Sequence, residues 1–257
     1  MSDRDIESLA REAGLGTISK TAVSGICREL RDRYRAFRAS SLGEVRLLVL
    51  MLDAIFLPVR PQGPKEGVLV AWGFTTEGER VLLEVCLGQR ERTEDWLDLG
   101  RGLIARGLRS PLLVISDGAP GLVRSISELW PDADRGRCAV HKLRNILAKL
   151  PKRPELHARV RAAYWAALDT AISPSEAEHG LRVLVGELSA EYPSAAACLA
   201  DDLAALTVHL AYPLRLRKRL RSTNLLERSL EEVRRRTKVI GVVPGRDQLS
   251  DDGLGGH

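Results

Sequence analysis

The segment VRLLVLMLDAIFLPV, residues 45–59, decides the fold, because it is a long apolar run interrupted by one carboxylate, Asp53. A second apolar run, residues 111–116, ends directly before another carboxylate, Asp117. Apolar runs of this kind form buried strands. A carboxylate at the end of such a strand is unfavourable unless a cation or hydrogen-bond donors compensate its charge. The two segments therefore predict a buried sheet that carries two functional acids.

The segments around these two runs predict an α/β fold with a mixed sheet. The pattern of three antiparallel strands occurs in residues 45–59, 68–74 and 81–87, separated by loop 60–67 and the Glu77-Gly78 turn. The later elements are a helix over 93–106 with Trp96, Leu99, Leu103 and Ile104 on one face, a parallel strand over 111–116, a helix over 121–130 and a strand over 137–140. Such an order gives a five-stranded sheet flanked by helices.

The beginning of the chain, residues 1–40, is predicted to be helical. A first helix, a turn at Gly14 and Gly16, and a second helix that begins near Ser19 resemble a helix-turn-helix. In that interpretation the second helix presents Ser19, Lys20, Thr21 and Ser24 to DNA, with Val23, Ile26, Cys27 and Leu30 as its apolar stripe. Two packed helices that touch no DNA have the same pattern, so both interpretations stay open.

The second half of the chain predicts three further segments. Residues 141–220 are rich in Ala, Leu, Arg and Glu, with breaks at Pro151, Pro154, Pro174 and Pro193, which indicates an all-α insertion. Residues 221–241 are expected to form a helix that completes the core of residues 45–140. Residues 242–257 are rich in Gly and Asp and are expected to be a disordered tail.

Composition narrows the class of protein. With 257 residues, 44% of them hydrophobic, the chain can bury a full core. Four widely spaced cysteines match no disulfide framework, and neither a signal peptide nor an apolar run of about 20 residues is present. We therefore expect reduced cysteines, no membrane association and a cytoplasmic location.

Positive charge is concentrated late in the chain. The net charge is +5, and residues 215–238 hold Arg215, Arg217, Lys218, Arg219, Arg221, Arg228, Arg234, Arg235, Arg236 and Lys238 against Glu227, Glu231 and Glu232. Such a segment attracts phosphates, although a solvated Arg-rich helix has the same composition.

Glu227 within this basic segment supplies a third acid. If the strands of Asp53 and Asp117 are neighbours, their carboxylates bridge Mg²⁺ or Mn²⁺, and Glu227 adds a ligand from a helix whose polar face includes Asn224 and Arg234. Each residue also has a structural interpretation: Asp53 as a strand-end residue, Asp117 in a turn, and Asn224 with Glu227 as a capping box. The joint occurrence of the three acids favours catalysis.

Cys138 and His141 form a Cys-x-x-His pair, followed by Arg144 and Asn145. A zinc site needs a second pair, and the other His and Cys residues offer no matching spacing, so we expect no zinc. A satisfied core pair and a histidine that donates to a phosphate oxygen are the remaining interpretations.

Several motifs resemble the Mutator-type transposases of bacterial insertion sequences. The similar segments are LDAIFLPVR at 52–60, LIARGL at 103–108, ISDGAPGL at 115–122, RCAVHKLRNILAKLP at 137–151 and STNLLERSLEEVRRRTKVIG at 222–241. The resemblance implies a ribonuclease H-like core with an all-α insertion before the last acid. It implies Asp53, Asp117 and Glu227 as the DDE ligands of Mg²⁺, which Mn²⁺ can replace.

The same resemblance implies the supporting residues and the reaction. Cys138 and His141 correspond to the Cys-x-x-His element of the family, and Asn224 and Arg234 accompany the glutamate. Arg144, Asn145, Arg235 and Arg236 are expected to support DNA binding. The implied reaction cuts the 3′ ends of an element and joins them to target DNA, with no covalent enzyme intermediate. The implied partners are the terminal inverted repeats, target DNA and further copies of the chain, in a bacterial cytoplasm where the DNA-bound protein is on the nucleoid.

The ends of the chain depart from the family pattern. The family has a longer DNA-binding region before the core and an aromatic and helical part after Gly241, where this chain reads VVPGRDQLSDDGLGGH. A truncated copy is therefore expected. The alternative to an active transposase is an inactive DNA-binding fragment that competes with an intact transposase. A ribonuclease H-like nuclease with a host function fits less well, because the long motif matches argue against it.

Overall fold

The computed structural model describes residues 19–58, 65–88 and 93–223. Its elements, in chain order, are α2 (Lys20–Ala39), β1 (Leu47–Pro58), β2 (Lys65–Thr75), β3 (Arg80–Gly88), α3 (Thr93–Ala105), β4 (Leu113–Ser116), α4 (Pro120–Leu129), β5 (Asp134–Arg137), α5 (Ala139–Ala148), α6 (Pro154–Asp169), α7 (Pro174–Ser189), α8 (Pro193–Ala200), α9 (Leu203–Thr207), the 3₁₀ turn η1 (Val208–Ala211) and α10 (Leu214–Leu220).

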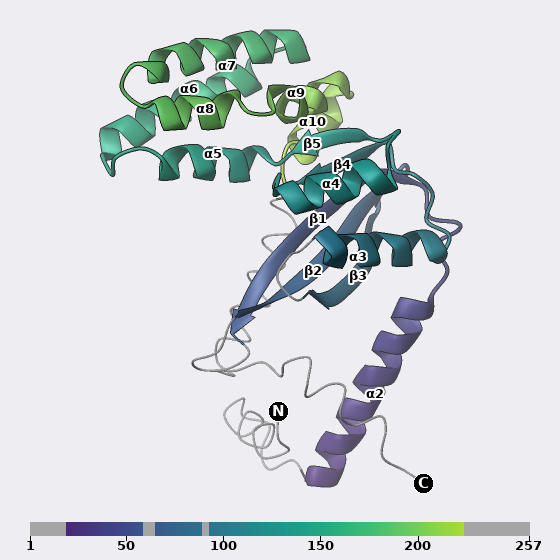
Figure 1. Cartoon of the computed structure of the whole chain (residues 1–257). Coiled ribbons are helices and arrows are strands. Elements are labelled where there is room, and N and C mark those ends of the chain that lie inside the picture. The colour runs from purple at the N-terminus through teal and green to yellow at the C-terminus, as the bar shows by residue number, and fades with distance from the viewer. Residues whose placement is uncertain (1–18, 59–64, 89–92, 224–257) are drawn as a thin grey trace.

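The strands form one sheet in the order β3-β2-β1-β4-β5 (Figure 1). β1 pairs antiparallel with β2, and β2 pairs antiparallel with β3. β4 pairs parallel with β1, and β5 pairs parallel with β4. The predicted mixed five-stranded sheet flanked by helices is confirmed. The strands that lead to Asp53 and Asp117 are adjacent, which meets the condition for their carboxylates to lie close together.

The two faces of the sheet have different cores, because successive side chains of a strand point to opposite sides. On one face, Leu50, Leu52 and Val114 pack under α3 and α4, which Figure 1 shows lying side by side over the sheet. On the other face, a second cluster contains Val49, Met51, Leu113, Ile115, Cys138 and Leu220. The last residue of α10 therefore covers the face to which the odd-numbered side chains of β1 and β4 point.

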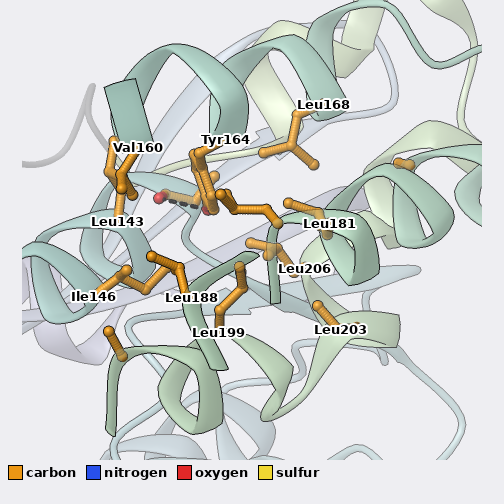
Figure 2. Close-up of a cluster of buried hydrophobic side chains, with 14 of the residues drawn as sticks. Leu143, Ile146, Val160, Tyr164, Leu168, Leu181, Leu188, Leu199, Leu203 and Leu206 are labelled. Atoms are coloured by element: carbon orange, nitrogen blue, oxygen red, sulfur yellow. Dashed lines mark hydrogen bonds between the residues drawn. The ribbon is translucent and has the colours of Figure 1, made fainter. Parts of the chain in front are cut away.

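Helices alone make up the part of the chain between Ala139 and Leu220. Figure 2 shows their common core, in which Leu143, Leu181 and Leu206 surround Tyr164. The buried Tyr164 hydroxyl donates a 2.9 Å hydrogen bond to the carbonyl of Ala139, the first residue of α5. The helical core thus holds the start of α5 at the end of β5.

Prolines begin three of these helices. Pro154, Pro174 and Pro193 are the first residues of α6, α7 and α8, where the missing N–H costs nothing. The predicted breaks at these prolines are therefore helix starts. Of the helices in the described ranges, none alone is long and apolar enough to cross a membrane, and one bent pair, Pro193–Ala200 with Leu203–Ala211, passes that test by length and composition.

Two details of the predicted elements are wrong. The fifth strand is Asp134–Arg137 instead of residues 137–140, and Val140 lies in α5. This polar strand is stabilised by distant partners, since the Tyr212 hydroxyl bonds Asp134 at 2.8 Å and Arg135 pairs with Asp202. Ile104, expected on the packed face of its helix, is 41% exposed.

The predicted helix that begins near Ser19 is confirmed as α2. The Ser19 hydroxyl accepts a hydrogen bond from the backbone N–H of Ala22 and caps the helix. Figure 1 shows α2 extending away from the sheet, with Ile26 and Leu30 at least half exposed. The first helix and the glycine turn of the expected helix-turn-helix lie outside the described residues.

Candidate active site

Asp53 lies in β1, and Asp117 directly follows the adjacent parallel strand β4. In the pairing of β1 with β4, Val49 lies opposite Leu113 and Met51 opposite Ile115, a constant offset of 113 − 49 = 64 residues. The two acids have the same offset, 117 − 53 = 64, and Asp117 directly follows the last residue of β4. Matching positions of neighbouring strands point to the same face of a sheet, so both carboxylates lie on the face covered by α10.

Asp53 is almost completely buried, with 6% of its surface exposed. Its Oδ1 accepts a 2.8 Å hydrogen bond from the Ala54 backbone N–H, and its Oδ2 accepts a 3.1 Å hydrogen bond from the Thr223 hydroxyl. Burial raises the pKa of Asp53 to about 6; the charge of His141 and the two hydrogen bonds lower it, and the charge of Asp117 raises it further. The site therefore holds a carboxylate whose negative charge is poorly compensated by the protein.

Asp117 is half-buried and shapes the turn that leads into α4. Its Oδ1 accepts a 2.8 Å hydrogen bond from the Ala119 backbone N–H. Gly118 has φ +83°, in the left-handed region that favours glycine. Within the described residues, the other oxygen of Asp117 accepts no hydrogen bond. Asp117 can therefore hold this turn with one oxygen and bind a cation with the other.

Cys138 directly follows β5, the third parallel strand, as Asp117 directly follows β4. Ser116 lies opposite Arg137, an offset of 137 − 116 = 21, and Cys138 follows Asp117 by the same 21 residues. Its fully buried Sγ accepts a 3.4 Å hydrogen bond from the Thr223 backbone N–H. Burial alone would raise the pKa of Cys138, but hydrogen bonding with His141 and Thr223 and the charge of His141 together lower it.

His141 lies close to Asp53 and to Cys138. It is the third residue of α5 and is half-buried, and its charge acts on Asp53 as well as on Cys138. The structure therefore brings together four of the predicted residues: Asp53, Asp117, Cys138 and His141. Arg144 and Asn145 are exposed on α5. The predictions for Asn224, Glu227 and Arg234 to Arg236 fall outside the described residues.

The donor set fits a hard divalent cation. Mg²⁺ is usually held by one or two carboxylates together with water and substrate phosphates, and Asp53 with Asp117 offers two carboxylates on one face. Within the described ranges, no group of three or more His, Cys, Asp or Glu side chains is arranged to hold a metal ion. A third protein ligand would have to come from other residues.

Thr223 is the site residue that sequence reasoning missed. It is fully buried between Asp53 and Cys138, which lie 170 and 85 residues earlier in the chain. In the sequence it is a polar residue before Asn224, and no local pattern distinguishes it from a helix cap. Only the tertiary fold places its hydroxyl beside an acid.

A basic cavity is lined by α10 and the end of α6. It has a volume of about 320 Å³, and its lining includes the cations Arg215, Arg217, Lys218 and Arg221. Arg221, two residues before Thr223, pairs with Asp169, and its guanidinium lies 4.6 Å from the ring centre of Trp165. The cavity therefore offers positive charge for a phosphate-bearing ligand at α10.

Comparison with known proteins gives the family. Residues 1–250 of the chain match a family model described as "Transposase, Mutator family". The chain is 34% identical over 224 residues to the transposase for insertion sequence element IS6120 of Mycolicibacterium smegmatis, covering 86% of this chain and 68% of that protein.

Two other relatives agree. The chain is 33% identical over 249 residues to the transposase for ISRM5 of Rhizobium meliloti, covering 96% of this chain and 62% of that protein. It is 34% identical over 251 residues to the transposase for IS1081 of Mycobacterium tuberculosis, covering 97% of this chain and 60% of that protein. The chain thus spans 60% to 68% of the length of these relatives. The family match over residues 1–250 and these identities show that the chain belongs to the Mutator family of transposases.

Proposed function

We propose that this chain is a DDE-type DNA transposase that cuts the 3′ ends of an insertion sequence and joins them to target DNA. The observation that carries the proposal is that Asp53 in β1 and Asp117, directly after the adjacent parallel strand β4, lie close enough for their charges to interact. The buried, poorly compensated charge of Asp53 supports a cation at this point. The relatives are named transposases of insertion sequence elements, which supports the same class of reaction.

The proposed fold is ribonuclease H-like, with an all-α insertion before the last acid. The order of three antiparallel strands followed by two parallel ones supports this assignment. The helices from α5 to α10 lie between β5 and the predicted position of Glu227. In this arrangement the insertion ends at Thr223, where the chain returns to Asp53.

The proposed metal ligands are Asp53, Asp117 and Glu227, for Mg²⁺ or its substitute Mn²⁺. A bound divalent cation would make the attacking hydroxyl more acidic and offset charge on the scissile phosphate. The side chains around it have other tasks: Ala54 and Thr223 orient the Asp53 carboxylate through hydrogen bonds. His141 places a group that can donate to a phosphate oxygen beside Asp53.

The proposed partner is DNA, at the terminal repeats and at the target. Arg215, Lys218 and Arg219 are exposed on α10, whose Leu220 packs on the sheet face that carries the acids. Cations in this position hold a sugar-phosphate backbone independently of its sequence. Assembly of several copies on DNA and a cytoplasmic location stay predictions from the resemblance and the sequence.

A strand-transfer assay tests the proposed reaction. The purified chain is incubated with Mn²⁺, labelled linear DNA that carries the sequences flanking its gene, and a plasmid target. Asp117→Asn removes one proposed ligand, and Asp132→Asn removes the charge of an exposed carboxylate as the matched control. We expect nicked and joined products from the wild type and from Asp132→Asn, and a loss of at least about a hundredfold from Asp117→Asn.

Two outcomes decide between the candidate functions. Equal amounts of product from the wild type and Asp117→Asn contradict the catalytic role of this acid. Binding of the labelled ends without product from any of the three proteins would instead identify a non-catalytic DNA-binding fragment that competes with an intact transposase.

A further inference from the structure

We infer that Thr223 is a positioning residue that fixes the carboxylate of Asp53, and that Cys138 holds Thr223 in place. This inference rests on the proposed function, because it adds a residue to the proposed metal site. It also gives the cysteine of the Cys-x-x-His pair a task other than metal binding.

The first step concerns the two oxygens of Asp53. Oδ1 is held by the backbone N–H of the next residue, Ala54, a contact available to any residue at that position. Oδ2 is held by the hydroxyl of Thr223, from a distant part of the chain. A carboxylate held at both oxygens has one orientation, and one oxygen held alone would leave it free to rotate. Thr223 therefore sets the direction in which the remaining lone pairs of Asp53 face.

The second step concerns the single proton of the Thr223 hydroxyl. Two acceptors lie within reach, Oδ2 of Asp53 at 3.1 Å and Sγ of Cys138 at 3.5 Å. The carboxylate oxygen is nearer, and a charged oxygen is a stronger acceptor than sulfur. The hydroxyl proton is thus directed to Asp53. The sulfur of Cys138 then accepts the hydrogen bond from the backbone N–H of Thr223.

The third step concerns the segment that carries Thr223. The Thr223 backbone N–H donates to Sγ of Cys138 at 3.4 Å, and the Ala139 backbone N–H donates to the carbonyl of Arg221 at 2.8 Å. These two bonds join residues 221–223 to the start of α5 from both directions. Arg221 is further held by Asp169, the last residue of α6. Thr223 is therefore placed by the sheet end and by the helical insertion together.

The full burial of Thr223 distinguishes it from an ordinary helix-capping threonine. Thr223 and Cys138 have no exposed surface, and Asp53 has 6%. A capping threonine bonds to nearby backbone N–H groups, whereas this hydroxyl bonds to an acid on another element. A hydroxyl kept from water and directed to a proposed metal ligand is suited to holding that ligand in register.

Four proteins test the inference: the wild type, Thr223→Val, Thr223→Ser and Thr207→Val. Thr223→Val keeps the shape and removes the hydroxyl, and Thr223→Ser keeps the hydroxyl. Thr207 is also fully buried, and its hydroxyl lies within hydrogen-bond reach of the Leu203 and Ala204 carbonyls in α9 and of Glu178 Oε1. Thr207→Val therefore controls for the loss of a buried hydroxyl that contacts an acid outside the proposed metal site. Mn²⁺ affinity is measured by electron paramagnetic resonance, single-turnover DNA cleavage by gel, and folding by thermal melting.

We expect Thr223→Val to bind Mn²⁺ about tenfold more weakly and to cleave about tenfold to a hundredfold more slowly, because a displaced ligand disturbs the reacting geometry. Thr223→Ser is expected within about threefold of the wild type, and Thr207→Val is expected to keep its Mn²⁺ affinity. If Thr223→Val does not fold, Thr223→Ala takes its place in the same comparison.

Wild-type Mn²⁺ affinity and cleavage in Thr223→Val would overturn the inference and leave the proposed function standing. Equal losses in Thr223→Val and Thr223→Ser would overturn it as well, because the hydroxyl would then not be the group that matters. A wild type that binds no Mn²⁺ would overturn the proposed function and this inference together, which is a different pattern from the other two.

Discussion

Gly118, the residue after Asp117, packs directly on the guanidinium group of Arg137. A Cβ added at Gly118 would lie 2.1 Å from Cζ of Arg137, and Gly118 has φ +83°. Arg137 has 9% of its surface exposed, so its side chain has little room to move. The turn that presents Asp117 therefore depends on a glycine for its backbone angle and for this close contact.

We predict that Gly118→Ala lowers the free energy of unfolding by about 2 to 4 kcal/mol, from left-handed backbone strain and the clash with Arg137. Gly78→Ala is the matched control, because Gly78 has φ +89° with nothing within 4 Å of an added Cβ. Urea unfolding of both variants measures the difference. A loss in Gly118→Ala no larger than that in Gly78→Ala would show that the contact with Arg137 is unimportant.

The ion pair between Arg135 and Asp202 joins β5 to the helical insertion. Both Asp202 oxygens accept hydrogen bonds of 2.5 Å from the guanidinium. We predict that Asp202→Asn lowers the free energy of unfolding at pH 7 by about 2 kcal/mol, since it leaves a partly buried cation without its partner. Asn tolerates the φ of 66° at this position.

The pH dependence of this effect follows from the pKa of Asp202, which hydrogen bonding with Arg135 lowers. The stabilisation is present above the ordinary pKa of 3.8 and is lost as pH falls through the lower folded value. The control Asp98→Asn removes an 82% exposed carboxylate that pairs with Arg101, and we expect a change within about 0.5 kcal/mol. Equal effects of both variants would contradict the assigned importance of the Arg135 pair.

His209 is expected to make the protein sensitive to mild acid. Burial lowers the pKa of His209 to about 4 from the ordinary 6.5. Between these two pH values His209 is therefore protonated in the unfolded chain and neutral in the folded chain. Stability therefore falls as pH decreases from 6.5 towards 4, by about 2 kcal/mol at pH 5. Urea unfolding at pH 7.5 and pH 5 should show a smaller fall in His209→Gln than in the wild type. The exposed His179→Gln is the control, and a fall that is the same in all three proteins contradicts this role of His209.

Asp53 is predicted to reduce stability at neutral pH when no metal is present. Burial raises its pKa from 3.8 to about 6, so its contribution becomes unfavourable as pH rises through this range. We expect Asp53→Asn without metal at pH 7.5 to be more stable than the wild type by about 3 kcal/mol, from about 1.36 kcal/mol per pKa unit. Asp132→Asn should change stability by less than about 0.5 kcal/mol. A destabilised Asp53→Asn protein would contradict the poorly compensated charge at this position.

The sheet was predictable because its strands are long apolar runs with clear turns between them. Residues 47–52 and 111–115 are continuously apolar, as a strand covered on two sides requires. β5 was placed wrongly because its polar sequence, DRGR, is stabilised by Tyr212 and Asp202 from late in the chain. Local patterns contain no information about partners so distant.

The candidate site was predictable only in part, for a related reason. Asp53 and Asp117 were recognisable because each carboxylate directly follows an apolar run. The expectation that both end a strand is wrong for Asp53, which lies in the middle of β1 because the strand continues to Pro58 in its pairing with β2. Thr223 was not, since its importance comes from contacts with residues 170 and 85 positions away. The place of Glu227 stays a prediction, because it lies outside the described residues.

Direct measurement of Mn²⁺ binding tests whether Asp53 and Asp117 share a divalent cation. Electron paramagnetic resonance titration of the wild type, Asp53→Asn, Asp117→Asn and Asp132→Asn, without DNA, gives the affinity of each protein. Loss of either site acid should weaken binding by at least about tenfold, because each removes one of two charged oxygen ligands, and Asp132→Asn should bind like the wild type. Equal Mn²⁺ affinity in all four proteins would contradict a shared metal site at these two acids.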